Sequence, residues 1–358
     1  MKRVAFILLS LTITQLVLAQ NTVCFTVSTN PNPSDPAIGG LTKYVDVYGC
    51  SIYAESTIPD AKVLHAAAVW AELIDNDEDG IVDDPALLTQ LQNSQAIMPI
   101  FQTDGNAASN AFFNNYNGNG AAAVLWDNEI DPSNTGNWGY DASVEEIIHT
   151  INAVGHASIY PLAFNTQANS SLLATAMDSA RGGQWIAHPS NYPANAWYHY
   201  DDNTCDYECM AIEYLYWMIV SNMEILNNPS TCAGIADEWE PCSQVLLQST
   251  DVLGYALITN PNYKLPQNAP DGNYCPTSLG VENMNLSSFK MYPNPANKLV
   301  TINRNEDTSS ILNLRNTLGQ EIISKVISEK TITLDLSGLV NGVYFISIGS
   351  TINKLTIN

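Results

Sequence analysis

The sequence predicts an α+β protein in which a mixed central domain is followed by a small β-sandwich. Between residues 40 and 265, short apolar runs rich in β-branched and aromatic residues alternate with segments of helical periodicity. From residue 289 onward, apolar and polar residues alternate in short runs between turn residues, which is typical of antiparallel strands. The 358 residues are enough for these two parts to form separate domains.

The N-terminal segment predicts export. Lys2 and Arg3 precede an apolar run that ends near Ala19, so residues 1–19 have the arrangement of a secretory signal peptide. This run is too short and too often interrupted by polar residues to span a membrane, and we expect no transmembrane segment. The formal net charge of -23 would repel phosphate backbones, so nucleic acid is not an expected partner.

All seven cysteines follow the signal peptide, and in an exported chain they predict disulfides. One cysteine must remain unpaired. The pairs that proximity along the chain favours are Cys24–Cys50, Cys205–Cys209 and Cys232–Cys242. A zinc site built on Cys205 and Cys209 is the alternative.

Residues 44–55 predict a strand or hairpin around Gly49, and Pro59 and Asp60 then begin a helix. Strands are predicted at residues 96–101 and 121–126. The other helices that periodicity predicts lie at residues 106–116, 170–180, 243–250 and 252–259.

The first predicted helix runs into an acidic segment, DNDEDGIVDD. The residues that reproduce the DxDxDGxxD spacing of calcium-binding loops are Asp75, Asp77, Asp79, Gly80 and Asp83. In such loops alternate oxygens converge on one hard cation. The twelfth position is Ala86 rather than glutamate, so the segment looks closer to the shorter loops of dockerin and thrombospondin repeats. We expect the four aspartates to bind structural Ca²⁺; a solvated acidic turn is the alternative.

Residues 141–160, DASVEEIIHTINAVGHASIY, predict a helix with more ionisable side chains on one face than packing requires. Asp141 or Ser143 is the expected N-cap. An apolar arc would face the core, and a separate polar arc would present ligands. The residues on that polar arc are Glu145, His149, Asn152 and His156.

The spacing of Glu145, Glu146 and His149 resembles the HExxH helix of zincin metalloproteases, with glutamate in place of the first histidine. The resemblance implies that Glu145 and His149 bind Zn²⁺ or another divalent metal, and that Glu146 is the catalytic base. Asn152 and Gly155 stand where the longer motif has its glycine and third histidine, so a third ligand must come from elsewhere.

Glu213 is the candidate third ligand. It is the only charged residue of the apolar segment 209–222, and a buried carboxylate requires a cation or a hydrogen-bond network. Zincins with a distant glutamate ligand place it on a later helix, and the order of elements over residues 40–270 is similar to the lethal-factor-like branch. The alternative is a structural one, with His149 in the core and Glu213 paired with Arg181.

Residues 185–200 are dense in aromatic residues and proline, and such a loop would line a cleft. Its candidate residues for substrate binding or for stabilising an oxyanion are His188, Tyr198, His199 and Tyr200. Aromatic packing at the surface is the alternative.

The domain plan is a signal peptide at residues 1–19, a central domain at 20–265, a linker at 266–288 and a C-terminal domain at 289–358. Three motifs in the last segment, at residues 292–295, 316–320 and 336–344, closely resemble the type A C-terminal sorting domain of the type IX secretion system of Bacteroidetes. The resemblance implies that type IX machinery carries the protein through the periplasm and outer membrane. The domain is then removed, and the cargo is secreted or attached to the cell surface.

These expectations define an exported or cell-surface calcium-binding protein with a zincin-like domain that cleaves peptide or protein substrates. The alternative is a calcium-stabilised surface protein that binds a partner without catalysis, and the glutamate at position 145 favours it. A di-iron carboxylate enzyme is less favoured, because the chain has no second Glu-x-x-His pair around which to build one.

Overall fold

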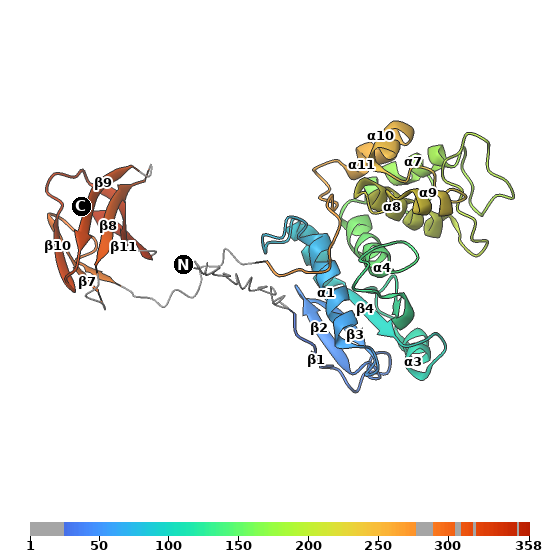
Figure 1. Cartoon of the computed structure of the whole chain (residues 1–358), viewed down its shortest axis with the longest axis horizontal. Helices are drawn as coiled ribbons and strands as arrows, with labels where there is room; N and C mark the ends of the chain where they lie inside the picture. The colour runs from blue at the N-terminus through green and yellow to red at the C-terminus, as the bar shows by residue number, and fades with distance from the viewer. Residues whose placement is uncertain (1–24, 277–288, 305–308, 318–319, 349–350) are drawn as a thin grey trace, which may run out of the picture. The chain divides into compact units, whose positions relative to one another are not determined.

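The structure is a computed structural model that describes residues 25–276, 289–304, 309–317, 320–348 and 351–358. The chain divides into two compact units, one ending at Pro276 and the other comprising the residues after it (Figure 1). The first unit contains helices and a sheet and the second contains strands, which confirms the α+β class with a β-rich C-terminal region. The predicted signal peptide, residues 1–19, lies outside the described residues.

The first unit contains a five-stranded sheet in the order β1-β2-β3-β4-β5. Its strands are β1 (Ser28–Thr29), β2 (Lys43–Val47), β3 (Cys50–Ala54), β4 (Ile97–Phe101) and β5 (Leu125–Trp126). β2 and β3 form the predicted hairpin, and its two turn residues, Tyr48 and Gly49, have φ of 55° and 85° as tight hairpins require. β3, β4 and β5 run parallel, so the connection from β3 to β4 must cross over.

Helix α1 (Asp60–Ile74) makes that crossover together with α2 (Pro85–Asn93). α1 contacts β2 and β3 of the sheet and also packs against α4, which itself contacts β4 (Figure 1). Ala66, Ala67 and Ala71 are fully buried, and their small side chains let α1 approach its neighbours closely. The C-terminal end of α1 leads directly into the predicted calcium loop.

The helix predicted at residues 141–160 is present but is not uniform. It begins as α4 (Ser143–Thr150), continues as a π-helix (Ile151–His156) and ends as α5 (Ala157–Ile159). The predicted N-cap is wrong, because Ala142 occupies that position and provides no side-chain hydrogen bond. The Asp141 carboxylate instead accepts hydrogen bonds from the preceding loop.

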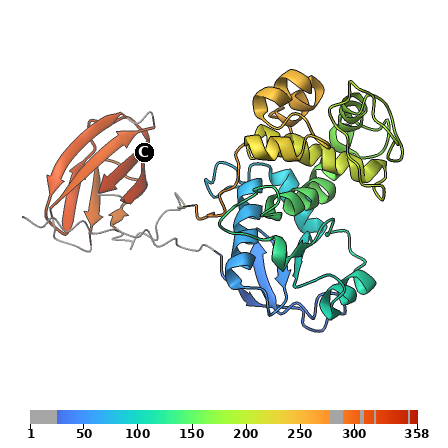
Figure 2. The ribbon, with the colours of Figure 1, turned by 45° about the vertical axis from the view of Figure 1, so that its right-hand side comes forward.

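The remaining helices of the first unit gather around α8 (Tyr207–Asn222), which contacts α4, α7, α10 and α11 (Figure 2). Most of α8 is buried, and this explains why its sequence is apolar on all sides. The other helices that follow α5 are α6 (Pro161–Phe164), α7 (Leu172–Ala180), α9 (Pro229–Gly234), α10 (Gln244–Thr250) and α11 (Val252–Ile258). Helix α3 (Ala107–Asn115) lies between β4 and β5 in the chain.

Two of the predicted disulfides, Cys205–Cys209 and Cys232–Cys242, are confirmed. The first disulfide removes the thiols that the alternative zinc site would need. The predicted Cys24–Cys50 pair is wrong, because Cys50 is a free thiol buried in the core, while Cys24 lies outside the described residues. Cys275 is disulfide-bonded.

The second unit is built from two antiparallel sheets, a three-stranded one in the order β10-β7-β6 and a four-stranded one in the order β12-β11-β8-β9. Val300 and Leu334 from one sheet and Leu314 and Ile346 from the other belong to one buried cluster. The strands are β6 (Lys290–Tyr292), β7 (Leu299–Asn303), β8 (Ser310–Asn316), β9 (Glu321–Ile327), β10 (Thr331–Asp335), β11 (Gly342–Ile348) and β12 (Thr351–Ile357).

Candidate metal centre

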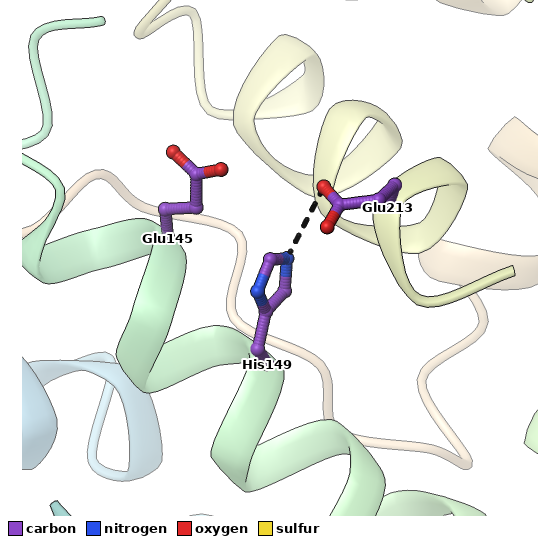
Figure 3. Close-up of side chains that lie close together, drawn as sticks. All are labelled: Glu145, His149 and Glu213. Atoms are coloured by element: carbon purple, nitrogen blue, oxygen red, sulfur yellow. Dashed lines mark ion pairs between the residues drawn. The ribbon is translucent and has the colours of Figure 1, made fainter. Parts of the chain in front are cut away.

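Two helices supply the side chains that the sequence predicts to bind a metal. Glu145 and Glu146 lie in the first turn of α4, and His149 lies in its last turn. Glu213 lies on α8, which contacts α4. The i, i+4 spacing puts Glu145 and His149 on one face of α4. Figure 3 shows that this face turns toward α8, where the three predicted ligands come together.

The three side chains form a compact cluster of donor atoms. One oxygen or nitrogen atom from each of Glu145, His149 and Glu213 lies within 4.8 Å of those of the other two. His149 Nε2 lies 3.6 Å from Glu213 Oε2, and His149 Nδ1 lies 3.8 Å from Glu146 Oε2. Both distances are longer than a hydrogen bond, so the ring lies between two carboxylates without bonding closely to either.

The His149 ring is buried without a hydrogen-bond partner for its outer nitrogen. Only 7% of the residue is exposed, and Nε2 has no partner in the described part of the chain. An unsatisfied buried polar atom costs roughly 1–3 kcal/mol, and native proteins leave few of them. After losing its proton, His149 Nε2 could therefore bind a cation between Glu145 and Glu213.

Negative charge concentrates around this ring. Burial alone would lower the pKa of His149, but contact with Glu146 and the charges of Glu213 and Glu145 raise it to about 9. Burial raises the pKa of Glu145 to about 7, with Glu146 and Glu213 adding to the shift. The pKa of Glu213 is raised chiefly by burial as well. A divalent cation would neutralise carboxylates that otherwise repel one another.

Tyr216 is a neighbour of the cluster that no motif in the sequence predicts. Its ring lies edge-on to His149, with 5.5 Å between the ring centroids. Burial raises the pKa of the Tyr216 phenol, and the charges of Glu145 and Glu213 raise it further, so the phenol stays protonated. It lies three residues after Glu213 on α8, but that helix contains several aromatic residues, so its spacing alone does not distinguish it.

Two tyrosines of the aromatic loop, Tyr198 and Tyr200, have a pKa that burial raises and that the charge of Glu213 raises further. Burial raises the pKa of Tyr200, as do the nearby charges of Glu213 and Glu145 among others. Tyr198 is fully buried and its hydroxyl donates to the backbone oxygen of Met210, so it is a core residue. His188 and His199 line a separate pocket of about 470 Å³.

Arg181, the alternative partner of Glu213, does not pair with it. Within the described ranges no ion pair of 4.0 Å or less joins Arg181 to a carboxylate. Its guanidinium is fully buried, donates from Nη1 to the backbone oxygen of Trp185 and lies near the rings of Tyr192 and Tyr207. Glu213 thus has His149 rather than arginine as its closest cationic neighbour.

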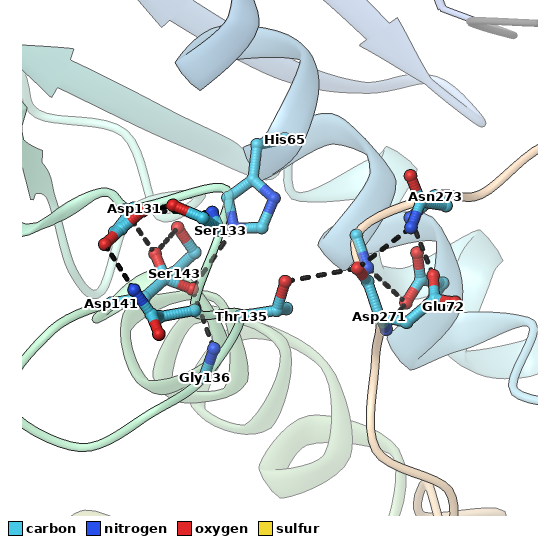
Figure 4. A network of polar contacts seen from close by, with 12 residues as sticks. His65, Glu72, Asp131, Ser133, Thr135, Gly136, Asp141, Ser143, Asp271 and Asn273 are labelled. Atoms are coloured by element: carbon cyan, nitrogen blue, oxygen red, sulfur yellow. Dashed lines mark hydrogen bonds and ion pairs between the residues drawn. The ribbon is translucent and has the colours of Figure 1, made fainter. Parts of the chain in front are cut away.

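A buried polar network holds the start of α4 (Figure 4). The Asp141 carboxylate accepts hydrogen bonds from the N–H groups of Asp131 (3.1 Å) and Gly136 (2.8 Å) and from the Ser143 hydroxyl (2.8 Å). His65 Nε2 lies 3.1 Å from Asp141 Oδ2, the oxygen to which Gly136 donates. Burial alone would raise the pKa of Asp141, but the hydrogen bonds from His65 and Gly136 lower it. This network fixes the turn that precedes Glu145.

In the predicted calcium loop, Asp75 is fully buried at the C-terminal end of α1. Its Oδ2 accepts a hydrogen bond from Gly80 N–H (2.9 Å) and another from the Tyr274 hydroxyl, whereas Oδ1 has no partner among the described residues. One oxygen from each of Asp75, Asp77 and Asp79 lies within 4.8 Å of those of the other two. Gly80 has φ of 87°, which explains the glycine at the sharp turn.

Asp83, the fourth predicted ligand, lies beside this group rather than in it. Its Oδ2 accepts the N–H of Asn76 at 2.9 Å. Burial raises the pKa of Asp83, and the charges of Asp77 and Asp75 raise it further. The loop therefore holds mutually repelling carboxylates, and a bound cation would relieve that repulsion.

Comparison with known proteins identifies the second unit. Residues 290–358 match the family described as the secretion system C-terminal sorting domain, which confirms the predicted type IX secretion cargo. The protein is therefore exported through the type IX system to the cell surface or the exterior. No curated protein matches the chain. Across the described ranges, every helix is too short or too polar to cross a membrane.

Proposed function

We propose that the first unit of this exported protein is a zincin-like, metal-dependent peptide hydrolase that structural calcium stabilises. The observation that carries the proposal is the buried Nε2 atom of His149, which lacks a hydrogen-bond partner and lies between carboxylates from two helices. Burial without a partner would be costly for a structural histidine. A role as a metal ligand explains both the burial and the lack of a partner.

The donor set fits a divalent cation. One imidazole and two carboxylates carry a formal charge of −2 when the carboxylates are ionised, so a divalent ion would balance the buried charge. Nitrogen and oxygen donors together suit Zn²⁺ and its neighbours among the first-row metals. A metal bound there would act as a Lewis acid that polarises the carbonyl of a peptide substrate.

Glu146 would be the general base. Its side chain is 25% exposed, so water can reach it, and its Oε2 lies 3.8 Å from His149 Nδ1. A carboxylate at this position would take a proton from the attacking water and pass it to the leaving amine. The Tyr200 phenol, which stays protonated because its pKa is raised, would donate a hydrogen bond to the oxyanion.

The second candidate function is that of a surface protein that binds a partner without catalysing a reaction. The observation in its favour is Glu145, which replaces the histidine that zincins have and interacts with the Tyr216 phenol. If that interaction satisfies Glu145 in the folded protein, the site has become structural. The two functions differ in a single property, the cleavage of peptide bonds.

The calcium part of the proposal rests on Asp75 Oδ1, a buried carboxylate oxygen with no partner in the described residues. Asp77 and Asp79 complete a group of hard oxygen donors around it, and Asp83 lies beside them. Hard oxygens in a loop of this spacing are the ligands that Ca²⁺ prefers. The cation would have a structural role, because the loop lacks the bidentate glutamate of regulatory sites.

Casein cleavage by the purified full chain tests the catalytic proposal. We expect cleavage that a strong chelator of transition metals abolishes, that added Zn²⁺ restores, and that Glu146→Gln reduces at least a hundredfold. Glu145→His, which creates the usual zincin ligand pair, should keep or raise the activity. Wild-type protein that holds its metal and cleaves no protein substrate would favour the binding function instead.

A further inference from the structure

The segment that follows α11 packs against the calcium loop and against the network that begins α4. We call residues 267–274 the strap. Asn76, which lies between the two predicted ligands Asp75 and Asp77, is its main attachment. Asn76 Oδ1 accepts the N–H groups of Gln267 and Asn268, both at 2.7 Å. The Asn76 amide also donates to Asn268 O at 3.0 Å, and the Asn268 amide donates to Asn76 O at 3.0 Å.

Two further residues at the end of α1 bind the strap. Glu72 is only 2% exposed, and its Oε2 accepts the N–H groups of Asp271 (2.6 Å) and Gly272 (3.1 Å). The Tyr274 hydroxyl donates to Asp75 Oδ2, while the other oxygen of that carboxylate, Oδ1, has no hydrogen-bond partner among the described residues. The strap is thus bound by Asn76 at residues 267–268, by Glu72 at residues 271–272 and by Asp75 at Tyr274.

The other side of the strap reaches the network beneath α4. The Thr135 hydroxyl donates to Asp271 O at 3.1 Å (Figure 4). Gly272 lies so close to His65 that a β-carbon there would be 2.6 Å from His65 Nδ1. His65 in turn contacts Asp141, which holds the loop before Ser143. A continuous set of contacts therefore joins the calcium loop to the start of the helix that carries Glu145 and His149.

We propose that Ca²⁺ bound at the Asp75 loop orders the strap and, through it, the turn that positions the ligand helix α4. This inference rests on the calcium site of the proposed function and names what that site regulates. The cation fixes the Asp75 carboxylate and the backbone on both sides of Asn76. Without it, repulsion between Asp75, Asp77 and Asp79 drives the loop apart and withdraws Asn76 from the strap.

Hydrogen exchange on the full chain, with excess Ca²⁺ or with EGTA, tests this coupling. We expect Ca²⁺ to slow amide exchange at least tenfold in residues 267–274 and in residues 131–143, while strand β4 stays unchanged as the internal reference. Calorimetric titration of the same protein with Ca²⁺ measures whether the cation binds. If Ca²⁺ binds but the exchange rates of either segment stay the same, the coupling is overturned. It is also overturned if Ca²⁺ slows exchange in β4 as much as in the two segments. Absence of Ca²⁺ binding would overturn the calcium site itself and the coupling with it.

Asn76→Ala separates the attachment from the cation site. The variant keeps Asp75, Asp77 and Asp79 and loses the side-chain bonds to Gln267 and Asn268. It should bind Ca²⁺ with less Ca²⁺-dependent protection of residues 267–268, while the bonds of Glu72 and Tyr274 to the rest of the strap remain. Asn117→Ala, at an exposed asparagine on another loop, is the matched control and should behave as the wild type. Ca²⁺-dependent protection of residues 267–268 that is as strong in Asn76→Ala as in the wild type would contradict the proposed route.

Discussion

At the scale of single residues, the environment of each ionisable group decides what it can do. His149 and His65 are both buried, yet His65 has Asp141 within 3.1 Å, whereas Nε2 of His149 has no hydrogen bond. His65 thus has a hydrogen-bond partner for the nitrogen that faces Asp141, whereas His149 Nε2 is an unsatisfied buried atom of the kind that the proposed metal would explain. The same contrast separates Asp141, whose oxygens accept several hydrogen bonds, from Asp75, which keeps one oxygen without a partner.

Asp141→Ala should destabilise the first unit strongly. The substitution leaves the N–H groups of Asp131 and Gly136 and the ring of His65 without their buried acceptor, which costs about 3 kcal/mol or more. Urea unfolding at pH 7 measures the loss. The control is Asp60→Ala, which removes an ion pair to Lys43 whose carboxylate is 62% exposed, and should cost less than about 1 kcal/mol. Equal losses in the two variants would show that the network carries no special stability.

At the scale of elements, hydrophobic periodicity predicts which segments are helices and which are strands. The hairpin around Gly49, the helix after Pro59 and both helices near residue 250 are confirmed. The strand predicted at residues 121–126 is reduced to Leu125–Trp126. Periodicity could not reveal the π-helix at Ile151–His156, because an inserted residue changes the hydrogen-bond pattern of the backbone without changing its composition.

The candidate site was predictable in its residues, whereas its surroundings were not. Glu145, His149 and Glu213 stand out because charged residues in apolar segments need a partner, and the structure brings them together. Tyr216 has no such signal, since a tyrosine in an apolar helix is ordinary. The wrong Cys24–Cys50 pairing has a similar cause: distance along the chain says little about which cysteines meet after folding.

The π-helix carries a titratable group that should make stability depend on pH. Burial lowers the pKa of His156 to about 4, below the value of about 6.5 expected in the unfolded chain. The unfolded state therefore binds a proton first as pH falls, and this residue removes roughly 1.5 kcal/mol of stability between pH 6.5 and pH 5. His156→Gln should be less stable than the wild type at pH 6.5. The difference in free energy of unfolding between the two proteins should be smaller at pH 5 by roughly 1.5 kcal/mol. Urea unfolding of both proteins at the two pH values measures this difference. A difference that does not change with pH would contradict the claim that His156 is buried in its neutral form.

At the scale of the whole molecule, export and chemistry belong to different units. Residues 290–358 match the sorting domain and carry the export address, while the candidate metal centre and the predicted calcium loop lie in the first unit. Each unit has its own buried core. We therefore expect the address and the site to be separable by mutation.

Deleting residues 290–358 should stop export without unfolding the first unit. In producing cells with type IX machinery, the truncated chain should remain in the periplasm, whereas the full chain reaches the cell surface or the medium. Fractionation and immunoblotting measure the distribution. Full-length Glu146→Gln is the control and should be exported normally, because that side chain lies outside the sorting domain. Export of the truncated chain would show that the address lies elsewhere.

The most direct test of the metal centre is the metal content of the purified full chain, measured by mass spectrometry after dialysis. The wild type should retain one equivalent of Zn²⁺ or another first-row divalent ion in addition to Ca²⁺. His149→Ala should lose the first-row ion and keep the Ca²⁺, because it removes only the imidazole ligand between Glu145 and Glu213. A wild type that holds calcium alone, or a His149→Ala variant with an unchanged first-row metal, would contradict the proposed centre.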